Sequence, residues 1–282
     1  MDRGESGSGP MEPPPSVDDL FPGDDATSAA HRACDWAATP LGPVESWPAE
    51  LCAAVRTVLP SKIPMLLWWG PELVQIFNHA YTPVLGDKYP AAVGQRGAEC
   101  WAEVWAELGP LTEQVLAGHG ATYSENQLLM LDRHGYLEET YWTFSYSPAC
   151  DGRGRVAGIF VATTDVTARV LGDRRLETLR ELGSVSIAEA DTADDAVRAA
   201  GRVLAGSPAD LPLLMIYLRH GRTVPDEDAT PSADPGGDEL VLAASFGVDA
   251  GDGPVAGPAP EWLPEVVEVM RTGRPVRARG LA

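Results

Sequence analysis

One stretch, residues 64–167, carries an order of apolar patterns that few folds can accommodate. It opens with two short apolar runs, Pro64–Trp69 and Leu73–Phe77, on either side of the dipeptide Gly70-Pro71. Short runs rich in bulky apolar residues around a Gly/Pro turn predict a β-hairpin. Asn78 follows the second run and is a good helix N-cap, because its side chain can accept a free backbone N–H.

The rest of this stretch first becomes helical and then returns to strands. Residues 90–118 show apolar residues at helical spacing, and Gly109-Pro110 predicts a break in that helix. Three strand patterns follow, separated by Gly-containing turns, over 121–131, 136–148 and 156–164. The order of two strands, helices and three strands predicts an α+β fold, a five-stranded antiparallel sheet with helices on one face.

The chain before the hairpin divides into two segments. Residues 1–30 are rich in Gly, Ser, Pro and Asp, and we expect a disordered tail because they offer too little apolar surface to offset chain entropy. Residues 31–63 form a predicted N-terminal cap, with a helix starting at Trp47-Pro48. That helix either closes an open edge of the sheet or contributes to a dimer contact, and the first reading is favoured.

Two further segments follow the last strand. Residues 168–183 place Val170, Leu176, Leu179 and Leu182 among charged residues, which predicts an amphipathic connector helix able to pair in a dimer. Residues 184–282 predict a second α+β module, with a helix near 193–205, strands at 213–219 and 239–246, and a helix at 262–271.

Composition excludes several classes of function. The formal net charge is −20, with 21 Lys and Arg against 41 Asp and Glu, and no basic cluster suggests a nucleic-acid surface. The four cysteines are widely spaced, which favours free thiols in a reducing cytoplasm. No apolar run approaches the ~20 residues of a membrane span, and no secretory signal is evident. We therefore expect a cytoplasmic protein without nucleic-acid or membrane partners.

Motifs for catalysis and metal binding are missing. None of the five histidines has the spacing of a metal site, and no phosphate-binding glycine loop or nucleophile elbow is present. The phosphoacceptor and ATP-binding motifs of sensor kinases and the cysteine motif of flavin photoreceptors are also absent. The chain is expected to catalyse nothing itself and to hold no metal, and its cofactor stays unknown.

The arrangement as a whole resembles the PAS family. The element order, the helix start at Asn78 and the closing Asp165-Val166-Thr167 carry the resemblance, together with Trp36, Thr39–Pro43 and Trp47-Pro48 in the lead-in. The PAS domain would span 64–167, and 184–282 resembles the first part of a GAF domain. The Arg-, Ala- and Gly-rich composition suggests a GC-rich, actinobacterial-like genome.

The resemblance implies the sensory input region of a cytosolic bacterial signalling protein. Its output would be a sensor histidine kinase of a two-component system, or alternatively a PPM-type serine phosphatase. A second hypothesis is a PAS dimerisation or interaction module that binds no ligand. A homodimer through the N-terminal segment and the connector helix, and a possible small-molecule ligand, are the implied partners.

The resemblance also nominates site residues. In PAS relatives the pocket lies between the sheet and the helices, and the aromatic and apolar residues at corresponding positions are Phe77, Trp101, Trp105, Leu116, Tyr123, Tyr141, Trp142 and Phe144. Plain core packing is the more frequent role of such residues, and strand alternation places Tyr141 and Phe144 on opposite faces. Signal relay is assigned to Asn78, Asp165 and Thr167, of which Asp165 can pair with a basic residue or cap the connector helix.

Overall fold

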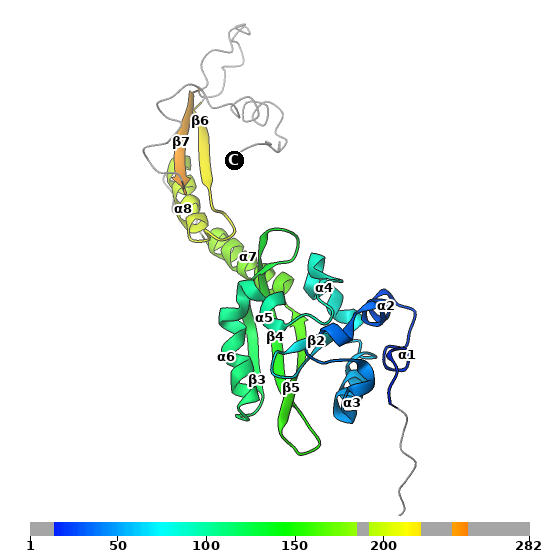
Figure 1. Ribbon diagram of the computed structural model, residues 1–282. Coiled ribbons are helices and arrows are strands. Elements are labelled where there is room, and N and C mark those ends of the chain that lie inside the picture. Colours follow the sequence, from blue (N-terminus) through cyan, green and yellow to red (C-terminus); the bar gives the residue numbers. More distant parts are fainter. Residues whose placement is uncertain (1–13, 185–191, 221–238, 248–282) are drawn as a thin grey trace, which may run out of the picture. The chain divides into compact units, whose positions relative to one another are not determined.

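The computed structural model describes residues 14–184, 192–220 and 239–247. The chain divides into two compact units, Met1–Gly172 and Asp173–Ala282. The first unit is built on a five-stranded antiparallel sheet with the order β2-β1-β5-β4-β3 (Figure 1). Its strands are β1 (Met65–Trp69), β2 (Val74–Phe77), β3 (Thr122–Asp132), β4 (Leu137–Cys150) and β5 (Val156–Asp165). The predicted sheet is confirmed.

The β1–β2 hairpin forms where the sequence predicts it. Leu66 pairs with Phe77 and Trp69 with Val74. Gly70 has a φ of +76°, a conformation that a residue with a Cβ adopts only with strain. Alternation along β1 sends Leu66 and Trp68 to one face of the sheet and Leu67 and Trp69 to the other, so both faces of this strand are buried.

Short helices cover the first face of the sheet. They are η3 (His79–Tyr81), α4 (Thr82–Leu85), η4 (Gly86–Lys88), α5 (Gly97–Cys100), η5 (Ala102–Val104) and α6 (Trp105–Leu116). The predicted break at Gly109-Pro110 is wrong, because α6 runs through Pro110. Pro110 removes one intrahelical hydrogen bond, but Leu108 and Val115 on either side of it are buried in the same core and hold a single helix against the sheet.

The N-terminal segment covers the second face, over β2, β1 and β5. It contains α1 (Val17–Leu20), α2 (Ala26–Ala33), η1 (Trp36–Ala38), η2 (Val44–Ser46) and α3 (Ala49–Val58). The prediction of disorder up to residue 30 is wrong for its described part, because Leu20 and Phe21 are fully buried. Phe21 stacks on Trp36 with ring centroids 5.6 Å apart. These contacts supply the apolar burial that the local sequence lacks.

The free edge of β2 is bonded by loop residues and by His31. The Gln75 N–H donates to the Gln95 carbonyl, and the Phe77 N–H donates to His31 Nε2 at 3.4 Å. His31 Nδ1 lies 2.8 Å from the Thr27 carbonyl. Helix α3 starts after Pro48 as predicted, but its contacts are with β1, next to the edge strand. The expectation that α3 closes the sheet edge is therefore corrected: α3 lies over a face.

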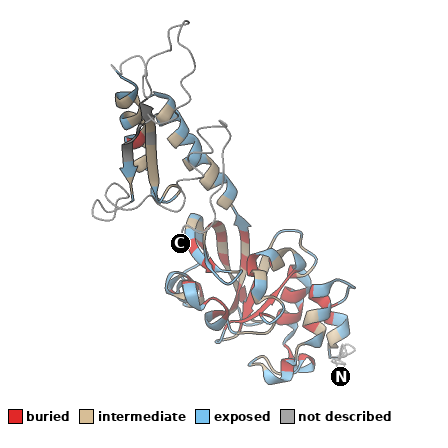
Figure 2. Cartoon of the chain, turned by 90° about the horizontal axis from the view of Figure 1, so that it is seen from above, coloured by how far each residue is buried: buried red, intermediate tan, exposed pale blue. Residues whose placement is uncertain are grey.

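Helix α7 (Thr167–Ser184) follows β5, at the predicted position of the connector helix. No residue of α7 is buried, in contrast to the sheet (Figure 2). Leu176 and Leu179 are 50 % and 60 % exposed. In the described part of the chain, no helix is both long and apolar enough to cross a membrane.

The second unit is described in part. Helix α8 (Ala193–Ala205) and the antiparallel strands β6 (Leu214–His220) and β7 (Glu239–Phe246) occur where the sequence predicts them. Within this unit, Asp210 accepts two hydrogen bonds from Arg174, at 2.6 and 3.0 Å, and one from Arg175. The predicted helix at 262–271 lies outside the described residues.

Candidate functional site

A small cavity lies between the sheet and the helices of the first unit. Its volume is about 30 Å³. It is lined by Trp68, Tyr81, Val84, Trp101, Leu108, Leu129, Leu131, Trp142, Phe144, Tyr146, Val161 and Thr163. Pockets for drug-sized ligands occupy ~300–1,000 Å³, whereas a single water needs roughly 10–15 Å³. The cavity therefore has room for a water or two and not for a drug-sized ligand.

The walls of this cavity include several polar groups. Burial raises the pKa of Tyr146, and burial together with the neighbouring Tyr146 and Cys100 raises the pKa of Tyr81, so both phenols are neutral donors. Trp142 Nε1 donates to Thr140 Oγ1 at 2.8 Å. The buried Trp101 Nε1 has no hydrogen-bond partner among the described residues. An unpaired buried N–H destabilises the fold by ~1–3 kcal/mol.

The predicted pocket residues separate into three groups. Trp101 and Trp142 line the cavity, and so does Phe144. Phe77, Trp105 and Leu116 belong to the same core without lining the cavity. Tyr141 pairs with Leu128 on the opposite face of β4 from Phe144, as alternation predicts. Sequence reasoning missed two lining residues, Tyr81 in η3 and Tyr146 in β4. Both are aromatic residues on elements that face the cavity, and that was the only signal available for them.

Tyr123 does not face the cavity. It is 67 % exposed and pairs with Ser145, on the outer face of the sheet. The reason is a β-bulge between Ser124 and Gln127, which inserts an extra residue into β3 and reverses its alternation. Counting by twos back from the buried Leu129 would point Tyr123 inward, so the sequence pattern misleads at this position.

The end of β5 joins the sheet to α7 through a compact set of hydrogen bonds. The Thr167 N–H donates to Asp165 Oδ1 at 2.9 Å, and the Val166 N–H donates to the Tyr141 carbonyl at 2.9 Å. Thr167 Oγ1 accepts the Tyr141 N–H at 2.9 Å. The first turn of α7 is thus bonded both to its preceding strand and to β4. Asp165 and Thr167 occupy the junction for which they were nominated.

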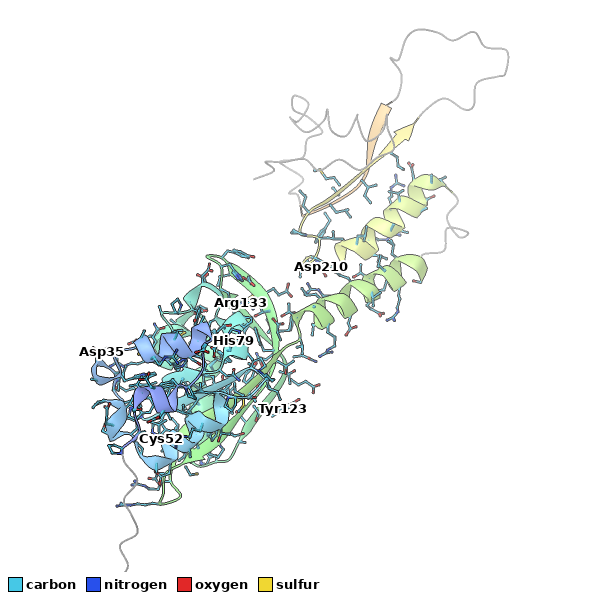
Figure 3. All side chains as sticks on the ribbon, turned by 90° about the vertical axis from the view of Figure 1, so that its right-hand side faces the viewer. Asp35, Cys52, His79, Tyr123, Arg133 and Asp210 are labelled. Carbon is cyan, nitrogen blue, oxygen red and sulfur yellow. The ribbon has the colours of Figure 1, made fainter. Side chains whose placement is uncertain are left out.

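Arg133 connects this junction to the rest of the first unit. It lies in the β3–β4 turn (Figure 3), and its side chain is 13 % exposed. Its guanidinium bonds to Glu138 at 2.6 Å, lies 3.8 Å from Asp165 Oδ2, and covers the ring of Trp142 at 5.7 Å. One side chain therefore contacts a cavity wall and the junction carboxylate. The sequence offered no signal for Arg133 beyond its place in a turn.

The backbone of Arg133 is bonded as well. Its carbonyl accepts the Asp87 N–H at 2.7 Å, so η4 is attached directly to the β3–β4 turn. Gly86 permits this approach, because a Cβ at that position would lie 2.4 Å from the same carbonyl oxygen. The helical layer, the cavity wall and the start of α7 therefore meet at one residue.

Asn78, directly after β2, makes a second set of contacts. It is fully buried. Its Oδ1 accepts the N–H groups of Tyr81 and Met65, and its Nδ2 donates to the carbonyls of Ser61 and Ile63. The predicted N-cap is confirmed, and the same side chain fixes the segment that enters β1.

In the described ranges, no group of three or more His, Cys, Asp or Glu side chains is placed to hold a metal ion. The thiols of Cys34, Cys52 and Cys100 have raised pKa values, in each case chiefly because burial disfavours the thiolate. The cavity and the junction thus present aromatic rings, neutral hydroxyls and one ion-pair network. This chemistry suits binding and conformational coupling.

The first unit resembles one known protein family. Residues 74–171 match the family described as PAS fold. Similar solved structures include the PAS domain of Bordetella pertussis BvgS, at 19 % identity, TM-score 0.31 and coverage of 47 % of this chain and 98 % of that one. A sensory box sensor histidine kinase from Vibrio cholerae matches at 16 % identity, TM-score 0.29 and coverage of 42 % and 87 %.

An RNA-binding light-oxygen-voltage receptor matches at 21 % identity with a TM-score of 0.35. The match covers 46 % of this chain and 36 % of the receptor, so the chain spans about a third of that protein's length. None of the curated proteins matches the chain. The family match assigns a PAS fold to residues 74–171, which contain β2, β3, β4 and β5 of the five-stranded sheet.

Proposed function

We propose that the chain is the input region of a cytoplasmic bacterial signal-transduction protein, in which the PAS domain controls a downstream domain through α7. The observation that carries the proposal is the junction of Asp165 and Thr167 with Arg133 and Tyr141. A change in the cavity wall at Trp142 would reach Arg133, and through it the carboxylate that caps α7. The output we favour is a sensor histidine kinase, with a PPM-type phosphatase as the alternative, and the second unit acts as a GAF-like module.

The free surface of α7 supports a homodimer in this proposal. Its apolar residues include Leu176 and Leu179, both exposed, and a helix with an uncovered apolar stripe can pair with a second copy. In contrast, the apolar side of α3 is buried on its own sheet, which leaves α7 as the better dimer contact. Analytical ultracentrifugation of the full chain tests this: L176S/L179S should be monomeric, and L137S, an equally exposed leucine on β4, should remain dimeric.

A second candidate function is a PAS interaction module that binds no ligand. The cavity of about 30 Å³ favours it, because a filled core needs no guest to be stable. Native mass spectrometry of the protein from its source separates the two candidates. A co-purifying small molecule supports the sensor, and a bare protomer mass supports the ligand-free module.

The class of output is tested on the product of the complete gene. Incubation with labelled ATP should give an acid-labile, base-stable phosphoprotein if the output is a histidine kinase. Release of phosphate from a phosphoserine peptide would instead identify the phosphatase. The substitution R133M should change whichever activity is found, whereas R153M, at an exposed turn arginine, should not.

A further inference from the structure

A larger cleft lies outside the PAS cavity, on the N-terminal side of the first unit. Its volume is about 430 Å³, within the ~300–1,000 Å³ of small-molecule sites. It is bounded by the chain around α1 and α2, by the end of α3 and by η3. Its lining includes the cations Arg56 and Lys62, the imidazole of His79, the carboxylate of Asp25, and the apolar Leu20 and Leu59.

The charge of this cleft is opposite to that of the chain. Acidic residues outnumber Lys and Arg by 41 to 21 overall, yet Arg56 and Lys62 face a single carboxylate in the lining. Neither cation makes a side-chain hydrogen bond or ion pair within the described ranges. The only other lysine, Lys88, bonds to Glu103 and to the Cys100 carbonyl. A local positive site on an acidic surface concentrates anions.

Asp25 is already occupied by its own helix. Its Oδ1 accepts the N–H groups of Thr27 and Ser28, at 2.9 and 3.0 Å, and its Oδ2 accepts the Ser28 hydroxyl at 2.7 Å. Burial would raise the pKa of Asp25, but these hydrogen bonds and the nearby His79 lower it overall. The carboxylate therefore serves as the N-cap of α2, and it neutralises the cleft only in part.

His79 is held in place by a buried hydroxyl. Its Nδ1 lies 3.0 Å from Thr27 Oγ1, and Thr27 is 2 % exposed. If Thr27 donates this hydrogen bond, the proton of the neutral imidazole is on Nε2, which has no partner among the residues that the structure describes. His79, labelled in Figure 3, then adds a hydrogen-bond donor to the two cations of the cleft.

The remaining lining is mostly apolar. Leu20 and Leu59 are joined by Pro22, Pro60 and Ala80. We propose that this cleft binds a small organic anion, a carboxylate on an apolar body, with Arg56 and Lys62 holding the carboxylate. Arg can bind a carboxylate through two parallel N–H bonds, and Lys adds a point charge. The apolar residues bury the hydrocarbon part.

Octanoate is a suitable probe, titrated calorimetrically into the full chain at low salt, with octanamide as the neutral match. We expect saturable single-site binding of octanoate and binding of octanamide weaker by about tenfold or more. The double variant R56Q/K62Q should lose about tenfold or more of the octanoate affinity, and R153Q should keep it. Arg56 and Lys62 are both exposed, so we expect the double variant to fold. Tryptophan fluorescence that matches the parent chain is the control for this.

Lysine footprinting locates the site independently. Because the chain has two lysines, acylation at Lys62 and Lys88 can be assigned by peptide mass. Octanoate should protect Lys62 and leave Lys88 unchanged. The proposal is overturned if octanoate does not saturate in the millimolar range, if R56Q/K62Q binds it as well as the parent chain, or if inorganic phosphate binds equally tightly.

Discussion

Lowering the pH from about 7 to about 5 should destabilise the first unit through His31. The imidazole is fully buried, and Phe21, Trp36 and Phe77 surround it. Its Nε2 accepts the Phe77 N–H, so a second proton would place two N–H groups against each other and a charge inside the core. Burial is the main reason why the pKa of His31 falls from 6.5 to about 4, against smaller opposing effects of Thr27 and Asp25.

The sign and size of this change in stability follow from proton linkage. Between these two pKa values the unfolded chain binds more protons than the folded one, so stability is fully present above pH 6.5 and is lost as the pH falls toward 4. At ~1.4 kcal/mol per pKa unit, the complete effect is about 3 kcal/mol, of which about 2 kcal/mol is lost between pH 7 and pH 5.

Urea unfolding followed by tryptophan fluorescence measures this change. Seven of the eight tryptophans lie in the first unit, so the signal reports on it. With a slope of ~2 kcal/mol/M, the midpoint of the parent chain should fall by about 1 M between the two pH values. H31Q keeps an acceptor for the Phe77 N–H but does not titrate, so its midpoint should be nearly independent of pH in this window.

H119Q is the matched control, because His119 is exposed and the same substitution there should leave the pH dependence intact. H31Q should start from a lower stability at pH 7, since it loses the ring contacts with Phe21, Trp36 and Phe77, so the comparison is between slopes. An unchanged slope in H31Q would refute the assignment of the pH dependence to His31. A steeper slope would show that other buried groups dominate.

Three further predictions concern burial and the α7 junction. F144A should lower the free energy of unfolding by ~3–5 kcal/mol, whereas Y123A should stay within ~0.5 kcal/mol because Tyr123 is exposed; urea unfolding measures both. F21A should also cost ~3–5 kcal/mol, and a value near zero would mean that the N-terminal segment does not pack on the sheet. T167V removes the acceptor of the Tyr141 N–H and should lower the free energy of unfolding by ~1–3 kcal/mol. It should also speed hydrogen exchange at the start of α7. Unchanged exchange would show that this hydrogen bond does not hold the start of α7 on β4.

Local sequence patterns were sufficient to predict most of the sheet. The hairpin around Gly70, the N-cap at Asn78 and the strand end at Asp165 depend on neighbours within a few residues, and all three were predicted correctly. The same holds for α7, whose charged and apolar residues recur at helical spacing. These features are local, so the sequence carries their signal directly.

The site depends on contacts between distant segments. Arg133 contacts Glu138 and Trp142 on the adjoining strand β4, and it reaches Asp165 only when the β3–β4 turn lies against the end of β5. The cleft around Arg56, Lys62 and His79 likewise joins three segments of the chain, residues 20–28, 56–62 and 79–80. No spacing rule along the sequence connects such residues.

The sequence by itself determined the order and type of the main elements, because hydrophobic periodicity and turn residues act over short distances. Only the tertiary structure decided where the N-terminal segment goes, since Leu20 and Phe21 are buried by residues of a face that the folded sheet creates. It also decided the direction of Tyr123, because one bulge in β3 reverses the alternation of a strand. Burial and register are properties of the assembled sheet, and they fixed which of the predicted residues became part of the site.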